Sequence, residues 1–402
     1  MKIYRLTIIA CLLFAFLPAA AQKFENLAPT PPMGWNSWNG FGCRVDEKLI
    51  RETADALVAS GMKDAGYQYV VIDDCWHGER DAQGFIQPNK EHFPSGMKAL
   101  GDYIHSKGLK FGIYSDVGRL TCGGRPGSRG HEYQDALTYA SWGVDYLKYD
   151  WCASEGLNAV GAYTTMRDAL YAAQRPVVLS ICEWGDNKPW EWAKPIGHLW
   201  RTTGDITHCW DCEENHGSWS SLGVMRILDK QRGLRVHAGP GHWNDPDMME
   251  VGNGMKQNED RAHFSMWAML AAPLVAGNDV RAMSKETQAI LTNKDVIAVD
   301  QDALGIQGFP AVSEDGLEMW LKPLANGDWA VCFLNRANEA KAIEFDWKAH
   351  YLKDDNFQKQ LDAAAVTYKI RDLWTKKDLG TTDTVFRTSV PPHDVAMLRL
   401  TR

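Results

Sequence analysis

After its first 21 residues, the sequence has no apolar run of the 18 or more residues that a membrane-spanning helix needs. It also lacks tandem repeats, heptad arrays and low-complexity tracts, so we expect neither a repeat architecture nor a long flexible linker. Positive charge is scarce, since 43 Lys and Arg residues stand against 51 Asp and Glu residues and the formal net charge is −8. An acidic chain without a basic stripe is a poor candidate for binding nucleic acid.

The first 21 residues have the pattern of an export signal. Lys2 and Arg5 precede an apolar stretch at 6–17, and the small residues at 19–21 offer a cleavage site. We therefore expect a periplasmic or extracellular protein, whose mature chain loses two positive charges and carries a net charge of −10. Cys11 faintly resembles a lipoprotein cleavage site, but apolar residues continue well past it, so lipidation is the lesser alternative.

Export makes disulfide bonds possible, and eight of the nine cysteines remain after loss of Cys11. Four of them follow predicted strand ends, where they could tie neighbouring loops together, although the sequence does not fix their pairing: Cys43, Cys75, Cys122 and Cys152. Cys209 and Cys212, with His208 and His216 nearby, have a spacing that also suits a metal. Structural zinc needs four matched ligands, so a local disulfide or two free thiols is favoured over a metal site.

Short apolar and β-branched runs recur along the first three quarters of the chain, and each ends in acidic, basic or aromatic residues. The runs lie at 33–36, 70–72, 111–114, 146–150, 177–182, 199–201, 239–247 and 270–276. Helix-like amphipathic segments, such as 47–65 and 96–108, separate them. Alternation of this kind indicates a parallel sheet, and about eight strands with polar residues at their carboxyl ends predict a (β/α)8 TIM barrel.

The last hundred residues have a different sequence pattern. Short alternating runs at 317–321 and 329–334 flank a turn signal at Asn326 and Gly327, which is typical of antiparallel hairpins. We therefore expect the catalytic barrel at 22–308 to be followed by a C-terminal antiparallel β-sandwich domain at 309–402.

The run at 146–150 contains the most informative pair of residues. Alternate residues of a strand share a face, so Lys148 and Asp150 should point the same way. An ammonium beside a carboxylate favours its ionised form, which is the form that a nucleophile needs. A purely structural ion pair is the alternative interpretation of these two residues taken alone.

Ten sequence blocks together resemble glycoside hydrolase family 27, the melibiase-type α-galactosidases. The barrel blocks are "PPMGWNSWNGFGC", "VVIDDCW", "GIYSDVG", "TCGGRPGSRGHE", "YLKYDWC", "CEWG", "WRTTGDI" and "WNDPDM". The blocks "IRDLWTKKDLG" and "PPHDVAMLRL" are similar to the C-terminal sandwich of that family. The resemblance covers essentially the whole mature chain in the right order.

The resemblance implies a catalytic pair. Asp150 falls at the position of the nucleophile and Asp205 at that of the acid/base, and a retaining glycosidase holds two such carboxyl groups roughly 5 to 5.5 Å apart. Asp150 would attack the anomeric carbon of an α-galactoside while Asp205 protonates the leaving oxygen. Lys148 would keep Asp150 charged, and Arg201 would bond the sugar or fix a carboxylate. The resemblance implies neither a metal nor a cofactor.

The resemblance also implies a set of sugar-binding residues. Asp73 and Asp74 match the pair that binds O4 and O6 of galactose, with Lys148 supporting them. The remaining contact positions are matched by Trp38, Tyr114, Asp247 and Met248, whereas Trp35 lies within the strand and is assigned to the core. Residues Cys182, Glu183 and Trp184 resemble the galactosidase form of a loop whose bulk excludes a 2-acetamido group. In some relatives the cysteine at this position is paired, but its partner position is Gly197 here, so Cys182 is expected to be a free thiol lining the pocket.

One segment departs from the family pattern. The loop at 208–218 is fuller than usual and begins three residues after Asp205, so it is expected to shape the site for the leaving group. The resulting hypothesis is a secreted, exo-acting α-galactosidase for raffinose-type oligosaccharides or galactomannan side chains. The alternatives are a β-L-arabinopyranosidase or other exo-glycosidase on the same fold, and a noncatalytic glycan-binding protein. The sequence gives no indication of the oligomeric state.

Overall fold

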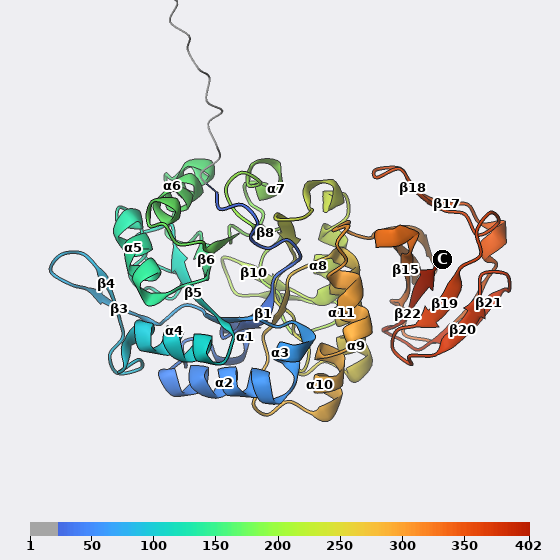
Figure 1. Cartoon of the computed structure of the whole chain (residues 1–402), viewed down its shortest axis with the longest axis horizontal. Helices are drawn as coiled ribbons and strands as arrows, with labels where there is room; N and C mark the ends of the chain where they lie inside the picture. The colour runs from blue at the N-terminus through green and yellow to red at the C-terminus, as the bar shows by residue number, and fades with distance from the viewer. Residues whose placement is uncertain (1–22) are drawn as a thin grey trace, which may run out of the picture.

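The computed structural model describes residues 23–402 of the chain, so the export signal expected at 1–21 lies outside the described residues. A helical barrel domain and a smaller all-β domain lie side by side (Figure 1). Within 23–402, no helix combines the length and the apolar character needed to cross a membrane.

The first domain is built on a curled sheet of eight parallel strands, in the order β11-β8-β7-β6-β5-β2-β1-β12. The strands are β1 (Met33–Asn36), β2 (Tyr69–Ile72), β5 (Lys110–Asp116), β6 (Tyr146–Asp150), β7 (Val178–Ile181), β8 (Leu199–Arg201), β11 (Trp243–Asp245) and β12 (Leu274–Ala276). A further parallel bridge joins Met249, just beyond β11, to Ala276 in β12 and brings the two edges together. The predicted TIM-barrel architecture is confirmed.

Helices surround the sheet. They are α1 (Trp38–Phe41), α2 (Glu47–Ala59), α3 (Met62–Ala65), α4 (Gly96–Ser106), α5 (Glu132–Trp142), α6 (Ala159–Ala172), α7 (Pro189–Trp192), α8 (Val224–Lys230), η1 (Leu234–His237), α9 (Gln257–Leu270), α10 (Lys285–Leu291) and α11 (Lys294–Asp300). The single helix expected at 47–65 is two helices, because Gly61 adopts a left-handed conformation with φ of 79° that ends the first. The Asp46 side chain caps α2 by accepting a hydrogen bond from the Leu49 N–H over 2.7 Å.

Strand alternation sorts the side chains between the inside and the outside of the barrel. A small apolar cluster fills the interior and includes Tyr69, Val71, Tyr146, Val178, Leu199 and Trp243. On β6, Leu147 and Tyr149 belong instead to the larger core that the helices share with the sheet. Lys148 and Asp150 therefore follow Tyr146 on the inner face, as the strand period predicts. Trp35 is fully buried and donates to the Asn278 carbonyl over 2.8 Å, consistent with the core role assigned to it.

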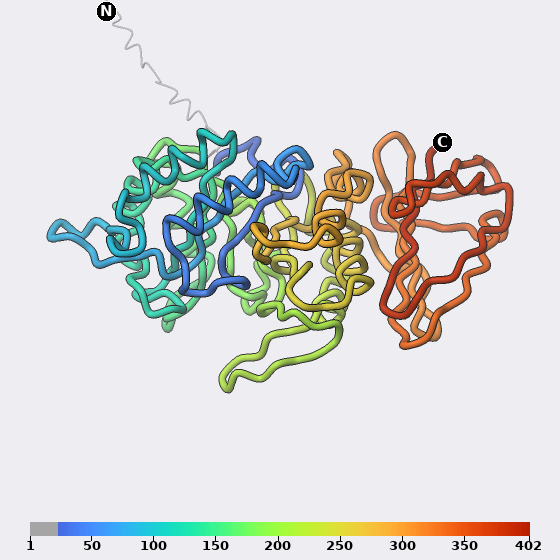
Figure 2. The backbone as a smooth tube through the Cα atoms, turned by 90° about the horizontal axis from the view of Figure 1, so that it is seen from below, coloured from blue at the N-terminus to red at the C-terminus, as the bar shows by residue number. Residues whose placement is uncertain are grey.

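Two hairpins outside the barrel sheet were not anticipated. β3 (His77–Arg80) pairs with β4 (Ile86–Pro88), and this hairpin projects from the rim of the barrel (Figure 1). β9 (Glu213–Asn215) pairs with β10 (Ser220–Leu222), and the yellow-green hairpin that they form stands out from the body of the protein in Figure 2. Both have few apolar residues, so the sequence carried little sign of them.

The C-terminal domain is all β. Its strands are β13 (Phe309–Glu314), β14 (Leu317–Pro323), β15 (Trp329–Asn335), β16 (Lys341–Phe345), β17 (Leu352–Asp354), β18 (Lys359–Leu361), β19 (Lys369–Asp372), β20 (Asp378–Thr381), β21 (Phe386–Val390) and β22 (Asp394–Thr401), with short helices η2 (Ala325–Gly327) and η3 (Trp347–Ala349). Six strands form the main antiparallel sheet and β16 pairs with β21 in a second one. An apolar core that includes Phe333 and Phe386, stacked with ring centroids 5.8 Å apart, joins the two layers.

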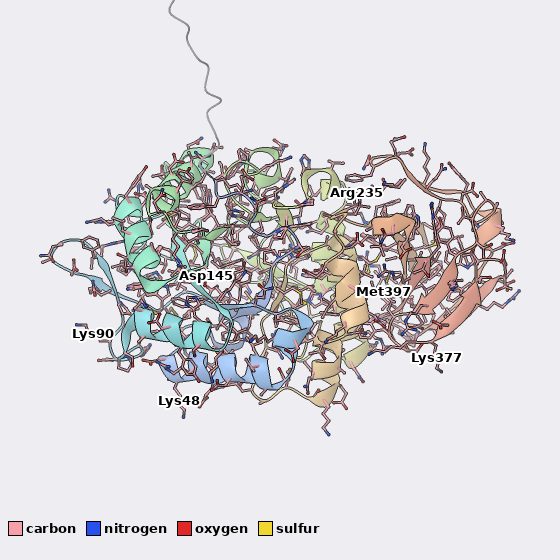
Figure 3. All side chains as sticks on the ribbon, viewed as in Figure 1. Lys48, Lys90, Asp145, Arg235, Lys377 and Met397 are labelled. Atoms are coloured by element: carbon pink, nitrogen blue, oxygen red, sulfur yellow. A yellow bond between two sulfur atoms is a disulfide. The ribbon has the colours of Figure 1, made fainter. Side chains whose placement is uncertain are left out.

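Helix α9 connects the two domains. Nearly all of its residues are buried, because one side packs on the barrel and the other contacts β15 and β22. A buried ion pair adds to this interface, since Arg235 in η1 donates to both carboxylate oxygens of Asp354 in β17, one of them over 2.7 Å. Arg235 lies where the barrel faces the C-terminal domain (Figure 3).

We predict that Asp354→Asn destabilises the protein by about 3 kcal/mol, because it leaves the Arg235 charge buried without a counter-ion. The Asp354 carboxylate also accepts hydrogen bonds from the backbone N–H groups of Asn356 and Phe357. The amide oxygen of asparagine can still accept these two bonds, so the turn after β17 should be retained. Asp355→Asn is the matched control, since this neighbour lies in an exposed pair with Lys353 and should cost at most about 1 kcal/mol. Thermal unfolding of both variants measures the difference, and equal melting temperatures would contradict the assigned role.

Candidate active site

A small pocket opens at the carboxyl ends of the barrel strands. Its walls come from strand ends and from the loops that follow them, which is where TIM-barrel enzymes hold their chemistry. The residues that line it are Trp38, Asn39, Asp73, Asp74, Tyr114, Cys122, Lys148, Asp150, Trp184, Arg201, Asp205, Asp247 and Met248. This set contains every residue predicted for the catalytic pair and for sugar binding except Cys182 and Glu183.

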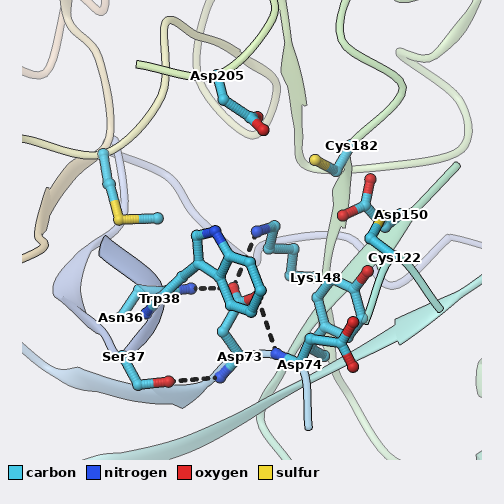
Figure 4. A network of polar contacts seen from close by, with 12 residues as sticks. Asn36, Ser37, Trp38, Asp73, Asp74, Cys122, Lys148, Asp150, Cys182 and Asp205 are labelled. Atoms are coloured by element: carbon cyan, nitrogen blue, oxygen red, sulfur yellow. Dashed lines mark hydrogen bonds and ion pairs between the residues drawn. The ribbon is translucent and has the colours of Figure 1, made fainter. Parts of the chain in front are cut away.

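Asp73 is the centre of a hydrogen-bond network at the floor of the pocket (Figure 4). Its Oδ2 accepts from Asn36 Nδ2 over 2.7 Å and from Lys148 Nζ over 2.9 Å. Its Oδ1 accepts from the Asp74 backbone N–H over 2.9 Å, and its own N–H donates to Ser37 Oγ over 3.0 Å. The side chain is therefore held in one orientation before any ligand arrives.

Asp74 is held mainly by backbone donors. Its Oδ1 accepts from the Cys75 N–H over 2.6 Å and its Oδ2 from the Gly123 N–H over 2.7 Å. Burial raises the pKa of Asp74, and these two hydrogen bonds oppose the rise because they favour the ionised form. Each oxygen retains lone pairs for hydroxyl donors of a ligand.

Lys148 and Asp150 both line the pocket, and the charge of Lys148 acts on Asp150 in the expected direction. Burial raises the pKa of Asp150 to about 6, and Lys148 only opposes this rise. The Lys148 ammonium bonds Asp73 instead, and the charges of Asp73 and Asp150 hold the pKa of Lys148 above its usual value despite its burial. Lys148 thus acts on both carboxylates as expected: it bonds Asp73, and its charge favours the ionised form of Asp150, although burial outweighs this second effect.

Arg201 joins the opposite wall of the pocket. Its Nη2 lies 3.0 Å from Asp205 Oδ1 and 2.9 Å from Asp247 Oδ2, so one guanidinium holds two carboxylates. Of the two alternatives for Arg201, fixing a carboxylate is the one that the geometry supports. Asp150 is only 5% exposed, whereas the Asp205 side chain is 39% exposed and faces the mouth of the pocket.

Aromatic and sulfur-containing side chains supply the less polar part of the lining. Trp38 begins α1, where its N–H donates to Asn36 Oδ1 over 2.8 Å. Trp184 follows β7 in a left-handed conformation with φ of 58°, which turns the chain sharply at the pocket wall. Tyr114 lies beneath Lys148, whose Nζ is 5.3 Å from the ring centroid.

Cys182 and Glu183 do not line the pocket, in contrast to the expectation. Cys182 is a free and buried thiol beneath the lining, 3.7 Å from Arg201 Nη1. Glu183 is fully buried and accepts from the backbone and side-chain N–H groups of Asn187 over 2.6 and 2.7 Å, so it shapes its own loop. Burial raises the pKa of Glu183 to about 7. Only Trp184 of the three can contact a ligand directly.

Three disulfide bonds brace the loops at this end of the barrel. Cys43 pairs with Cys75, joining the loops after β1 and β2, and Cys122 pairs with Cys152, joining those after β5 and β6. The local pair is also a disulfide, between Cys209 and Cys212. Of the three outcomes weighed for that pair, the structure has the local bridge.

Asp116 and Asn39 are the site residues that sequence reasoning missed. Asp116 is fully buried beside Asp150 and accepts from the Gly118 and Cys152 N–H groups over 2.6 and 2.9 Å, which ties together the loops that the Cys122–Cys152 disulfide also joins. Asn39 lines the pocket and donates to Glu250 over 2.5 Å. Both residues follow the ends of strands that the sequence predicts, at 33–36 and 111–114. Their position after a strand end was the signal that could have identified them as site residues.

Within residues 23–402, one group of side chains has the proximity that a metal ion requires, formed by Asp116, Cys122 and Cys152. Its two sulfur atoms share a disulfide, so they cannot act as the thiolates that bind metals. The group therefore does not fit a metal site.

Comparison with known proteins identifies the family. Residues 30–302 match the family model described as alpha galactosidase A, and residues 314–400 match the alpha galactosidase C-terminal beta sandwich domain. The chain belongs to the α-galactosidase A family.

Individual relatives agree with this assignment along nearly the whole chain. The chain is 63% identical over 388 residues to alpha-galactosidase A of Cellvibrio japonicus, covering 96% of each protein. Among solved structures, alpha-galactosidase I from Mortierella vinacea has a TM-score of 0.86 at 38% identity, with 93% of this chain and 98% of that one covered. The α-galactosidase of Saccharomyces cerevisiae in complex with raffinose has a TM-score of 0.85 at 31% identity, with 93% and 98% covered.

The raised pKa of Asp150 predicts an acid limb in the pH profile of any activity that needs its carboxylate. Since the group is ionised only above about pH 6, kcat/KM should fall about tenfold per pH unit below that value. Lys148→Met removes a charge that opposes the rise, so it should move the limb to higher pH. A wild-type profile that stays flat from pH 7 to pH 4 would contradict this account of Asp150.

Proposed function

We propose that the protein is an exo-acting retaining α-galactosidase that releases terminal α-D-galactose from oligosaccharides or polysaccharides. The observation that carries the proposal is the placement of Asp150 and Asp205 in one small pocket, the first deep and nearly inaccessible, the second at the mouth. A small pocket with the buried Asp150 inside and the partly exposed Asp205 at its entrance suits removal of one terminal sugar at a time. The family membership and the relatives' activity support the choice of substrate.

In the proposed first step, Asp150 attacks the anomeric carbon while Asp205 gives its proton to the glycosidic oxygen. The product is a covalent β-galactosyl enzyme and a free leaving group. Water, which loses its proton to Asp205, then attacks the same carbon and releases α-galactose with regeneration of both groups. Arg201 serves both steps by holding the Asp205 carboxylate, through its 3.0 Å contact, toward the scissile bond.

Recognition of galactose rests on the fixed acceptors at the pocket floor. Asp73 and Asp74 are proposed to accept hydrogen bonds from the axial O4 hydroxyl and from O6, and Trp38 to cover the apolar face of the ring. Because their orientations are set by Asn36, Lys148 and backbone N–H groups, little ordering is left to be done on binding. Trp184 limits the space near O2 and would exclude an acetamido group.

We also propose that the protein is exported from the cytoplasm. The amino-terminal pattern of residues 1–21 supports export, and the three disulfides support an oxidising compartment such as the periplasm or the extracellular space.

Substrate preference is tested with p-nitrophenyl glycosides. We predict that kcat/KM for the α-galactoside exceeds the values for the α-N-acetylgalactosaminide and the β-L-arabinopyranoside by about a hundredfold or more, because a single well-bonded hydroxymethyl or one steric clash is worth a few kcal/mol. Preference for the arabinoside would retain the mechanism and overturn the assignment of the O6 contact. Absence of turnover on all three would favour a noncatalytic glycan-binding role.

The nucleophile is tested by Asp150→Ala. This variant should lose at least about 10³-fold in kcat while still binding galactose, since the sugar contacts lie elsewhere in the pocket. Azide should restore turnover of an activated α-galactoside and yield the β-galactosyl azide, because the small anion enters where the carboxylate stood. Full activity of the variant without azide would end the assignment.

A further inference from the structure

The position of the acid/base fixes where the leaving group must lie. A general acid has to contact the glycosidic oxygen, so the next sugar of a substrate sits beside Asp205 rather than beside the deeply buried Asp150. The chain beyond that sugar can leave only through the mouth, where Asp205 is exposed. Whatever stands next to Asp205 on the outside of the pocket will therefore meet the rest of the substrate.

The β9–β10 hairpin stands at this place. Its return strand is bonded to the acid/base backbone, since the Leu222 N–H donates to the Asp205 carbonyl over 2.8 Å and Leu222 forms a parallel bridge with Ile206. The Ser220 carbonyl also lies against Gly204, where an added β-carbon would stand 3.6 Å from it. The Cys209–Cys212 disulfide and the Thr207 N–H, which donates to the Leu222 carbonyl over 2.9 Å, fix the base of the hairpin.

Trp219 is the exposed aromatic residue of this hairpin. Tryptophan has the largest side chain of the apolar residues, yet Trp219 is 51% exposed. It directly precedes Ser220 and lies three residues, or about 10 Å, along the strand from Leu222. The ring of His216 lies against it with centroids 4.1 Å apart and an interplanar angle of 30°, and His216 Nε2 is 2.9 Å from Ser221 Oγ. His216 thus supports one face of the Trp219 indole from within the hairpin. The exposed part of the indole remains available to a ligand.

The charge of the hairpin narrows the class of ligand. Glu213 and Glu214 are both exposed on β9, and neither forms an ion pair with any residue of the described chain. Asp211 adds a third acidic group, although Arg226 pairs with it over 3.0 Å. An acidic surface repels uronic acids and other anionic sugars but is compatible with neutral pyranoses, whose C–H faces pack on indole rings.

We infer that the β9–β10 hairpin is a leaving-group subsite in which Trp219 stacks against a pyranose of a neutral glycan chain that carries the galactose. The inference rests on the proposed function and deepens it, because it makes oligomeric and polymeric galactosides such as galactomannan the preferred substrates over short ones. A small glycoside carries no glycan chain beyond the scissile bond, so it does not engage this subsite.

The test compares Trp219→Ala with the wild-type enzyme on two substrates. One is p-nitrophenyl α-galactoside, which reports only the pocket, and the other is a galactosyl-substituted manno-oligosaccharide of at least five mannose units. KM for the oligosaccharide should rise about five- to tenfold, while kcat/KM for the small substrate stays within twofold. Trp219→Tyr should recover most of the loss because it restores a ring. Tyr351→Ala removes an aromatic residue of the C-terminal domain that is 60% exposed, against 51% for Trp219, and should change neither value.

Two results would overturn the inference. The first is an unchanged oligosaccharide KM in Trp219→Ala. The second is dissociation of a wild-type oligomer in Trp219→Ala, seen by sedimentation, which would assign the exposed ring to contact with another copy of the chain. Failure of the wild-type enzyme on the small substrate would instead reject the proposed function itself, so the two failures are distinguishable.

Discussion

The buried ion pair between Lys148 and Asp73 is the interaction on which the rest of the site depends. The pocket brings together more carboxylates than cations, since Lys148 and Arg201 face Asp73, Asp74, Asp150, Asp205 and Asp247. Charges in such a place must be paired or bonded to remain ionised. Lys148 meets this need at the floor, and Arg201 meets it at the wall by holding Asp205 and Asp247. The strand ends of the barrel deliver both cations to the centre.

This arrangement divides the carboxylates by role. Asp73 and Asp74 are each held by several donors and act as fixed acceptors, while Asp150 receives a single 2.9 Å bond from the Trp151 N–H and its pKa is raised to about 6. A partly satisfied carboxylate is the better nucleophile, because less hydrogen bonding has to be lost when it forms a covalent bond. Lys148 bonds Asp73 directly, whereas it only partly offsets the effect of burial on Asp150. The carboxylate that binds the sugar and the carboxylate that attacks it therefore differ in their hydrogen bonding.

Much of this could be predicted from the sequence, because apolar runs ending in polar residues mark barrel strands and their active ends. The barrel, the second domain and most of the pocket followed from that pattern and from family blocks. What failed depended on side-chain direction within loops. Glu183 has the same spacing as a pocket residue but turns toward Asn187. The β9–β10 hairpin lacks the apolar alternation that reveals strands, since it is held by its disulfide and backbone pairing.

The most direct test of the account is covalent trapping of the nucleophile. A 5-fluoro-α-galactosyl fluoride reacts to give an intermediate that hydrolyses slowly, because the fluorine destabilises the oxocarbenium-like transition state of release. Mass spectrometry of the intact protein and then of its proteolytic peptides locates the attached sugar. The account predicts one fluorogalactosyl group per chain, on Asp150. A label on Asp205 or on any other residue, or turnover of the reagent without a label, would contradict it.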